Sequence, residues 1–257
     1  MRDFIARGFV KSFEAGDADL AAINRLAIEP LTLDDVYVFE LEACDTEIDR
    51  ANERFDRSAI DQMAERYIGK TVIKDHMRRS DNQFARVYDA YGEDGTSSKG
   101  EPVRKLILRC YTRDCEANKE MIADIKAGIK KEVSVSFLPG SYTCSICGRD
   151  NKSDGMCRHW PGREYDGEKC HFTFSDIQDV YEVSFVAVPC QPDAATRKDF
   201  GDGGPEDADE HPDGKPHKKA LDGADQIEEE APGAGAFFME RAIALAEAEL
   251  TLAKGKR

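Results

Sequence analysis

The stretch Val180-Tyr-Glu-Val-Ser-Phe-Val-Ala-Val-Pro189 decides the fold of this chain, together with the earlier stretch Glu132-Val-Ser-Val-Ser-Phe137. Both alternate apolar and polar side chains, which predicts strands that bury one face. In the later strand we expect the buried face to hold Tyr181, Val183, Phe185 and Ala187, and the opposite face to hold Val180, Glu182, Ser184 and Val186. In the earlier strand we expect Glu132, Ser134 and Ser136 on the polar face. The two strands therefore present hydroxyl and carboxyl groups on a rigid sheet.

The rest of residues 31–200 predicts a mainly β fold with flanking helices. Strands are expected at 36–43, 70–76, 85–90 and 103–111, from their β-branched and aromatic content. Residues 92–101 are rich in Gly, Ser and acidic side chains and predict a loop. Helical spacing of apolar residues predicts helices at 18–27, 58–67 and 115–128.

Charge and composition exclude some classes of function. The 257 residues carry a formal net charge of −15, so nonspecific nucleic-acid binding is not expected, because it needs clustered Lys and Arg against phosphates. The opening residues do not resemble a secretory signal. No run approaches the roughly 20 apolar residues of a membrane span. We expect a soluble, cytosolic protein without a membrane partner.

Six candidate metal ligands fall within the 28 residues between the two strands. They are Cys144, Cys147, Cys157, His159, Cys170 and His171. In a reducing compartment this spacing indicates a metal site more than a disulfide framework. Tetrahedral binding by sulfur and nitrogen is typical of structural zinc, so we expect zinc to hold an inserted knuckle at 140–175. We expect Cys144 and Cys147 to supply one pair of ligands, with the other pair drawn from Cys157, His159 and Cys170. His171 is the least favoured.

The chain changes character after Pro192. Residues 202–230 contain eleven acidic side chains and three lysines, with Gly and Pro throughout, which predicts a disordered acidic linker at 201–235. Residues 237–254 have the spacing of an amphipathic helix, and we expect the segment 236–257 to be a docking or oligomerisation element. The N-terminal segment 1–30 shows no chemistry of its own.

Ser, His and carboxylate side chains occur together in the predicted sheet. His76 ends the strand at 70–76, and Ser134, Ser136 and Glu182 lie on the polar strand faces. A serine hydroxyl becomes an effective nucleophile when a histidine accepts its proton and a third group orients that histidine. The elements of such a site are present, although a histidine and a serine on strands are common in proteins.

Three segments resemble the prohead proteases of tailed phages, which belong with the herpesvirus assemblins. They are Thr71-Val-Ile-Lys-Asp-His-Met-Arg-Arg-Ser-Asp-Asn-Gln-Phe-Ala-Arg-Val87, Gly128-Ile-Lys-Lys-Glu-Val-Ser-Val-Ser-Phe137 and Asp179-Val-Tyr-Glu-Val-Ser-Phe-Val-Ala-Val-Pro189. The resemblance covers roughly residues 35–197. The runs Cys157-Arg-His-Trp-Pro-Gly162 and Tyr165-Asp-Gly-Glu-Lys-Cys170 are similar to the knuckle of a zinc-containing subset. The resemblance implies an assemblin-like β-barrel with an inserted zinc knuckle.

The resemblance also implies roles for individual residues. His76 corresponds to the general base and Ser134 to the nucleophile of a serine endopeptidase. Glu182 is expected to orient His76, with Asp179 as the alternative. Ser136 occupies the position of a glycine in the family's pattern, so it could crowd the site or be the working hydroxyl itself.

The resemblance further implies a place and partners. A protease of this kind acts in the host cytoplasm, inside the phage procapsid. It cuts scaffold and the major capsid protein during head assembly, and often cuts itself; some self-association is expected. The alternatives are a catalytically inactive assembly protein that keeps the fold, and a nucleic-acid-binding zinc knuckle.

Overall fold

The computed structural model describes residues 15–97, 99–190 and 195–196. The chain divides into the units Met1–Asp199 and Phe200–Arg257, and all described residues lie in the first. The predicted acidic linker and C-terminal helix lie outside the described residues. The described part is mainly β with a few helices, as predicted. Its helices are α1 (Asp17–Asn24), α2 (Arg57–Tyr67) and α3 (Lys119–Lys126), with short 3-10 turns at Leu33–Asp35, Ser80–Asn82 and Glu116–Asn118.

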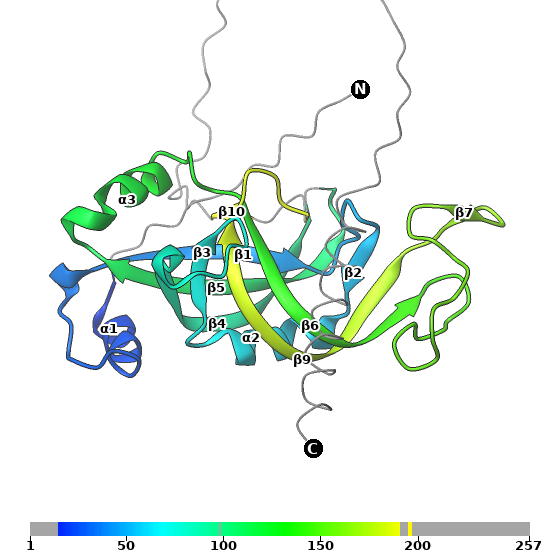
Figure 1. The fold of residues 1–257 in the computed structure, drawn as a ribbon, viewed down its shortest axis with the longest axis horizontal. Coiled ribbons are helices and arrows are strands. Elements are labelled where there is room, and N and C mark those ends of the chain that lie inside the picture. Colours follow the sequence, from blue (N-terminus) through cyan, green and yellow to red (C-terminus); the bar gives the residue numbers. More distant parts are fainter. Residues whose placement is uncertain (1–14, 98, 191–194, 197–257) are drawn as a thin grey trace, which may run out of the picture. The chain divides into compact units, whose positions relative to one another are not determined.

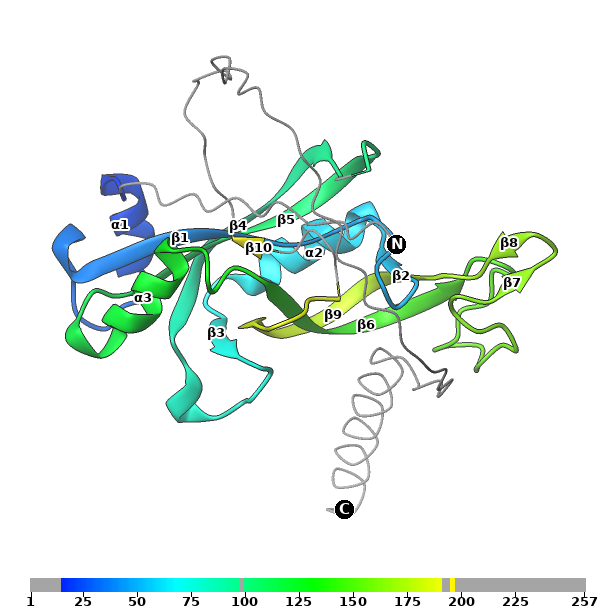
Figure 2. The same ribbon diagram turned by 90° about the horizontal axis from the view of Figure 1, so that it is seen from above.

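One large sheet holds most of the strands. They are β1 (Val36–Asp45), β2 (Glu53–Phe55), β3 (Thr71–Lys74), β4 (Ala85–Thr96), β5 (Pro102–Arg113), β6 (Val133–Cys144), β9 (Phe172–Phe185) and β10 (Ala195–Thr196). The order is β10-β1-β5-β4-β3-β9-β2, with β6 paired to the other side of β9. The long curved strands β6 and β9 run side by side in both views (Figures 1 and 2). The hairpin of β7 (Glu164–Tyr165) and β8 (Glu168–Lys169) is separate.

The prediction of a β-barrel is wrong, because the sheet does not close among the described residues. One end of the strand order is β10 on β1, and the other end is formed by β2 and β6 on β9. The outer edge of β1 pairs instead with the short β10, where Leu41 faces Thr196 and Glu42 faces Ala195. Closure needs a ladder between the two ends, and none of the described strands makes it.

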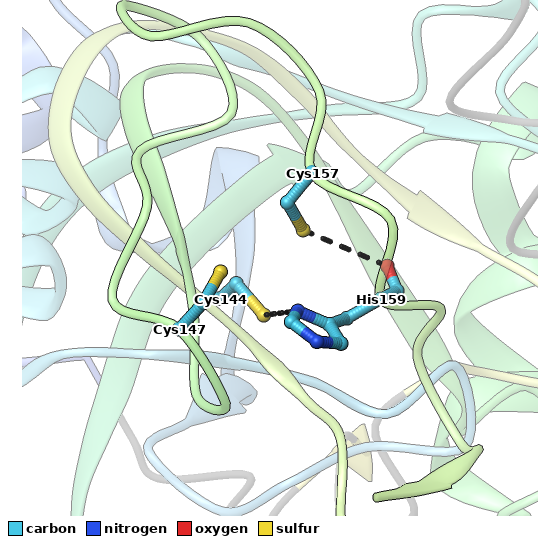
Figure 3. Close-up of side chains that lie close together, drawn as sticks. All are labelled: Cys144, Cys147, Cys157 and His159. Carbon is cyan, nitrogen blue, oxygen red and sulfur yellow. Dashed lines mark hydrogen bonds between the residues drawn. The ribbon is translucent and has the colours of Figure 1, made fainter.

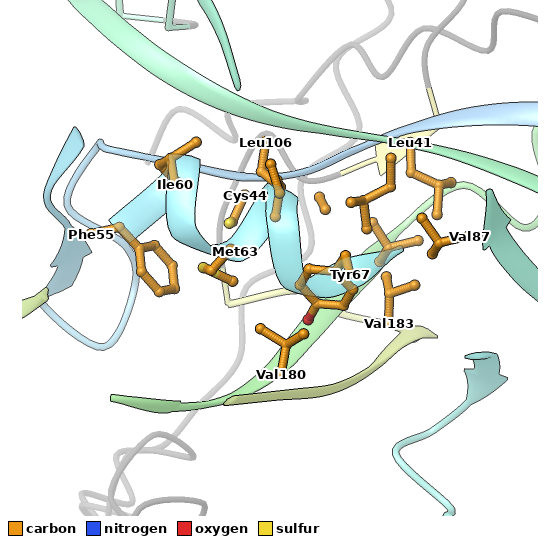
Figure 4. Packing of buried hydrophobic residues seen from close by; sticks show 14 of the residues in the cluster. Leu41, Cys44, Phe55, Ile60, Met63, Tyr67, Val87, Leu106, Val180 and Val183 are labelled. Atoms are coloured by element: carbon orange, nitrogen blue, oxygen red, sulfur yellow. The ribbon is translucent and has the colours of Figure 1, made fainter. Parts of the chain in front are cut away.

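Helix α2 packs the apolar face that its sequence predicts onto the sheet (Figure 4). The buried side chains of this face are Ala59, Ile60, Met63, Ala64 and Tyr67. Burying a large apolar side chain stabilises a fold by about 1.5 to 3 kcal/mol, so this face anchors the helix. The side chain of Asp56 caps the helix by accepting a hydrogen bond from the Ala59 amide at 2.6 Å. No helix in the described part of the chain is long and apolar enough to cross a membrane.

A β-bulge in β9 overturns part of the predicted alternation. Ser136 faces Glu182, but the next residue, Phe137, faces Val180, so Tyr181 is an extra residue in β9. Val180 is consequently buried in the core, where we predicted it on the polar face. Tyr181 is 37% exposed, where we predicted burial. The residues after the bulge keep the predicted alternation, so Val183 and Phe185 are buried as predicted.

Several strands differ in length from the predicted ones. β6 and β9 pair as far as Cys144 and Phe172, so they run into both ends of the segment predicted as an insertion, and residues 145–171 lie beyond the ladder. β9 ends at Phe185, which leaves Ala187 exposed where we predicted burial. β4 extends to Thr96 through Gly92, which we predicted in a loop. A Cβ atom at Gly92 would lie 2.5 Å from Asp61 Oδ1, so a larger residue there would displace the side chains of the Asp61–Arg104 ion pair.

Candidate functional site

Parallel pairing of β3 with β9 brings His76 to Glu182. The two strands run in register from Thr71 opposite Glu182 to Lys74 opposite Phe185, and His76 follows two residues after β3 ends. His76 Nδ1 lies 2.8 Å from Glu182 Oε1. The Glu182 side chain is 2% exposed and that of His76 is 25% exposed. A carboxylate only accepts hydrogen bonds, so the hydrogen of the pair lies on Nδ1 and a neutral ring keeps Nε2 as its acceptor.

Ser184 forms hydrogen bonds with both members of this pair. Its hydroxyl donates to Glu182 Oε2 at 2.7 Å and accepts from the His76 amide at 3.1 Å. The residue is fully buried. Both oxygens of the Glu182 carboxylate therefore have a partner, which is what a buried carboxylate requires.

Antiparallel pairing of β6 with β9 sets the two candidate serines beside this pair. Ser134 lies opposite Ser184, and Ser136 lies opposite Glu182. Ser134 is half-buried. The Ser136 hydroxyl accepts a hydrogen bond from Arg78 Nη2 at 2.5 Å, and the Arg78 guanidinium stacks 4.5 Å above the Tyr181 ring. The bulge thus turns Tyr181 outward, where its ring packs against the Arg78 guanidinium that bonds to Ser136.

Asp179, the alternative to Glu182, has other partners. Its Oδ1 lies 3.2 Å from Lys70 Nζ and accepts from the Val180 amide at 2.8 Å. It lies opposite Leu138 in the ladder, beyond the Tyr181 bulge. Of the two acidic residues, Glu182 is the one that contacts His76.

A cluster of cysteine and histidine side chains lies at the far end of β6 (Figure 3). Its members are Cys144, Cys147, Cys157 and His159, whose ligand atoms all lie within 4.8 Å of one another. Cys144 ends β6, and the turn after it returns through Gly148, whose φ of 69° is left-handed and favours glycine. The Asn151 side chain accepts from the Cys157 amide at 2.8 Å and so positions the third thiol.

This cluster could hold a metal ion. A tetrahedral zinc ion with bonds of about 2.3 Å to sulfur and 2.0 Å to nitrogen separates its ligand atoms by roughly 3.5 to 3.8 Å. Cys144 Sγ lies 3.7 Å from His159 Nδ1, within that range. The Arg149 amide donates to Cys147 and lowers its pKa to about 7, so this thiol readily becomes the thiolate that binds metal. Burial raises the pKa values of the Cys144 and Cys157 thiols.

Two further candidate ligands lie outside the group of four. Cys170 Sγ is 3.9 Å from Cys144 Sγ, so this buried thiol packs behind the cluster. His171 directly precedes β9, and its amide donates a hydrogen bond to Ser145 Oγ at 2.9 Å. Burial, followed by the charge of Arg54, lowers the pKa of His171. The structure therefore groups three of the four predicted cysteines with His159.

Sequence reasoning missed the contributions of Ser184 and Arg78. The alternation set Ser184 on the polar face, but no pattern marks it as the partner of both His76 and Glu182. Arg78 follows His76 by two residues, and only the bulge at Tyr181 brings a ring beneath it. Comparisons of the chain with protein-family models, with curated proteins and with solved structures find no match. The geometry of the polar face and of the cysteine cluster is therefore what bears on function.

Proposed function

We propose that this chain is a serine endopeptidase of phage procapsid maturation. The observation that carries the proposal is the hydrogen bond between His76 Nδ1 and the buried Glu182, formed one strand away from Ser134. A histidine held in this way is oriented by a carboxylate, which is the arrangement that activates a serine. The resemblance of the segments around His76, Ser134 and Glu182 to the prohead proteases supports the same reading.

The proposed reaction is acyl transfer. The Ser134 oxygen attacks the carbonyl carbon of the scissile peptide, and His76 Nε2 takes the hydroxyl proton. His76 returns that proton to the leaving amine as the carbon–nitrogen bond breaks, which leaves an acyl ester on Ser134. Water then attacks the ester with His76 again as the base, and the serine is regenerated. Glu182 remains a carboxylate and stabilises the charged imidazole.

We assign the cysteine cluster to structural zinc. Three thiols and one imidazole fit the ligand preference of this ion. Cys144, Cys147, Cys157 and His159 would hold it, and the ion would cross-link the segment 145–171. Since all four positions are filled by protein ligands, the zinc has no part in the proposed acyl transfer.

The proposed biological setting is the inside of an immature phage head in the host cytoplasm. The substrates would be scaffold and segments of the major capsid protein, with cleavage of the chain itself. Residues 201–257 would tether the enzyme to these partners through an acidic linker, which raises the effective concentration of the protease without tight binding.

The test is co-expression with a candidate major capsid protein, read by intact mass spectrometry. Wild type is expected to shorten the capsid protein, Ser134→Ala to leave it at full length, and Ser136→Ala to keep cleaving. Labelling by a fluorophosphonate, with the modified peptide identified by mass, reports the nucleophile independently of any substrate. A label on Ser136 would move the nucleophile to that residue.

One observation favours a second candidate function, a non-enzymatic assembly protein. The Ser136 side chain and the bound Arg78 guanidinium occupy the polar face next to Ser134, where the family's pattern has a glycine. If wild type fails to label and the capsid protein stays at full length while the two co-purify, this candidate replaces the protease.

A further inference from the structure

The turn that carries His76 has an unfavourable backbone conformation. Asp75 and His76 have φ values of 54° and 52°, so two successive non-glycine residues are left-handed. Such residues persist only where surrounding contacts impose the conformation, and they concentrate at functional sites. The contacts that hold this turn therefore determine where the His76 ring lies.

Backbone groups and one amide side chain hold the two ends of the turn. The Asp75 amide donates to the Phe185 carbonyl at 2.9 Å, and the Met77 amide donates to the Lys74 carbonyl at 3.1 Å. The Asn82 side chain donates to the carbonyls of Lys74 and Met77, at 2.8 Å each. These bonds close the turn around His76 without touching the ring.

Ser184 contacts His76 itself. Its Oγ accepts from the His76 amide at 3.1 Å and donates to Glu182 Oε2 at 2.7 Å, while Glu182 Oε1 meets His76 Nδ1 at 2.8 Å. The three residues form a closed ring of hydrogen bonds in which the backbone and the side chain of His76 are both tied to the same carboxylate. Since the hydroxyl hydrogen of this fully buried serine is used by Glu182, Ser184 is not available as a nucleophile.

We propose that Ser184 is the positioning residue of the His76–Glu182 pair. Its hydroxyl prevents rotation of the Glu182 carboxylate and holds the left-handed His76 backbone, so the imidazole keeps Nδ1 on the carboxylate. The proposal rests on the proposed function for its effect on catalysis, whereas the hydrogen-bond ring itself does not depend on activity. Loss of the hydroxyl would leave a buried carboxylate oxygen without its donor.

The first readout is the NMR resonance of the His76 Nδ1 proton, measured in the full-length chain. A ring nitrogen bonded to a carboxylate gives a downfield proton resonance, assigned by its loss in His76→Gln. We expect the resonance in wild type, its loss or displacement in Ser184→Ala, and its retention in Ser184→Thr, which keeps the hydroxyl. Ser175→Ala, the same change elsewhere on β9, is the matched control and should leave it unchanged.

The second readout is the rate at which a fluorophosphonate labels Ser134. Misplacing a catalytic group by about 1 Å lowers rates by up to roughly 100-fold, so we expect Ser184→Ala to label about 10- to 100-fold more slowly than wild type. Ser184→Thr should recover most of that loss, and Ser175→Ala should label like wild type. If Ser184→Ala fails to fold, the nearly isosteric Ser184→Cys replaces it, with a weaker donor and the same direction of effect in both readouts.

The outcomes separate the two claims. A Ser184→Ala variant that keeps the wild-type Nδ1 resonance and labelling rate overturns the positioning role. If wild type does not label at all but Ser184→Ala still loses the resonance, the proposed protease fails while Ser184 remains the residue that positions His76. Loss of the resonance in Ser184→Thr as well as Ser184→Ala would show that packing, and not the hydroxyl, holds the pair.

Discussion

The Tyr67 hydroxyl lies 3.1 Å from the Glu182 carbonyl oxygen and 3.4 Å from that of Ser136. Tyr67 is the last residue of α2 and is fully buried (Figure 4). Its side chain crosses the core and contacts β6 and β9 next to the Tyr181 bulge. Burial raises the pKa of Tyr67 well above its usual value, which keeps the hydroxyl protonated as a donor. One phenol thus supports the strand segments that carry Glu182 and Ser136.

Replacing Tyr67 by Phe should destabilise the fold. The change removes a donor from buried carbonyl oxygens, and an unsatisfied buried polar group costs about 1 to 3 kcal/mol. Urea denaturation should show that loss for Tyr67→Phe. Tyr111→Phe is the control, because its hydroxyl has no hydrogen-bond partner among the described residues, and it should change stability by less than about 0.5 kcal/mol. Equal stabilities for the two variants would mean that the hydroxyl of Tyr67 does not support the bulge.

Replacing Asp56 by Ala should weaken α2. Asp56 is the N-cap residue, and loss of such a cap costs about 0.5 to 2 kcal/mol. Ser58, whose hydroxyl donates to Asp56 Oδ1 on the exposed side, should be replaceable by Ala at less than about 0.5 kcal/mol. Thermal unfolding of the two variants makes the comparison, and a larger loss for Ser58→Ala would reassign the cap.

Stability should fall with rising pH because of Glu53. Burial, followed by the negative charge of Asp49, raises the pKa of Glu53 to about 8. The folded state therefore holds this proton more tightly than the unfolded state, whose pKa is about 4.3, and stability is lost as pH rises from about 4.3 through 8. Glu53→Gln should match wild type near pH 5 and be more stable by roughly 1 to 4 kcal/mol near pH 9.

The matched control for Glu53 is Glu168→Gln, an exposed glutamate on the β7–β8 hairpin. Its stability should follow wild type at both pH values in urea titrations. If Glu53→Gln is no more stable than wild type near pH 9, burial does not raise the pKa of Glu53.

Removing the metal should loosen the knuckle and leave the sheet. Purified chain should contain zinc in equal molar amount by elemental analysis, and Cys147→Ser should lose it, because the site then lacks a thiolate. Cys115→Ser, a thiol outside the cluster, should keep it. After chelation, hydrogen exchange should rise across 145–171 and stay low in β4 and β5. Zinc bound normally by Cys147→Ser would exclude this ligand set.

Local alternation predicted the burial of Val183 and Phe185 in β9, because a paired strand has a period of two whatever its partner. It failed at Val180 and Tyr181, since a bulge depends on the register between two strands that residues 145–171 separate, and it failed at Ala187, which lies beyond the end of β9. The open sheet was missed for a related reason. Closure depends on pairing between strands distant in sequence, and the resemblance that implied a barrel carries no information about the edge of β1.

In the candidate site, too, local pattern predicted the position of single residues, and the pairing of strands determined which of them meet. The strand pattern placed His76 at the end of one strand and Glu182 on the polar face of another, and the resemblance supplied the roles expected of them. Glu182 was expected ahead of Asp179 as the partner of His76, and the ladder pairs Glu182 with Thr71 at the start of β3, whereas Asp179 pairs with no residue of β3. Among the ligands, spacing identified the cysteines, while only the path of the knuckle separates Cys170 from the group with His159.

The central place of β9 has a consequence for the chain as it is synthesised. β9 pairs with β2, β3 and β6, all of which leave the ribosome before it. His76 is synthesised 106 residues before Glu182, so it cannot form the hydrogen bond to Glu182 until the end of β9 has left the ribosome. A nascent chain therefore carries no assembled polar face until β9 is made, and the pairing of β9 with β2, β3 and β6 is a late event of high contact order. Any chemistry of this face begins only after β9 has been made and paired.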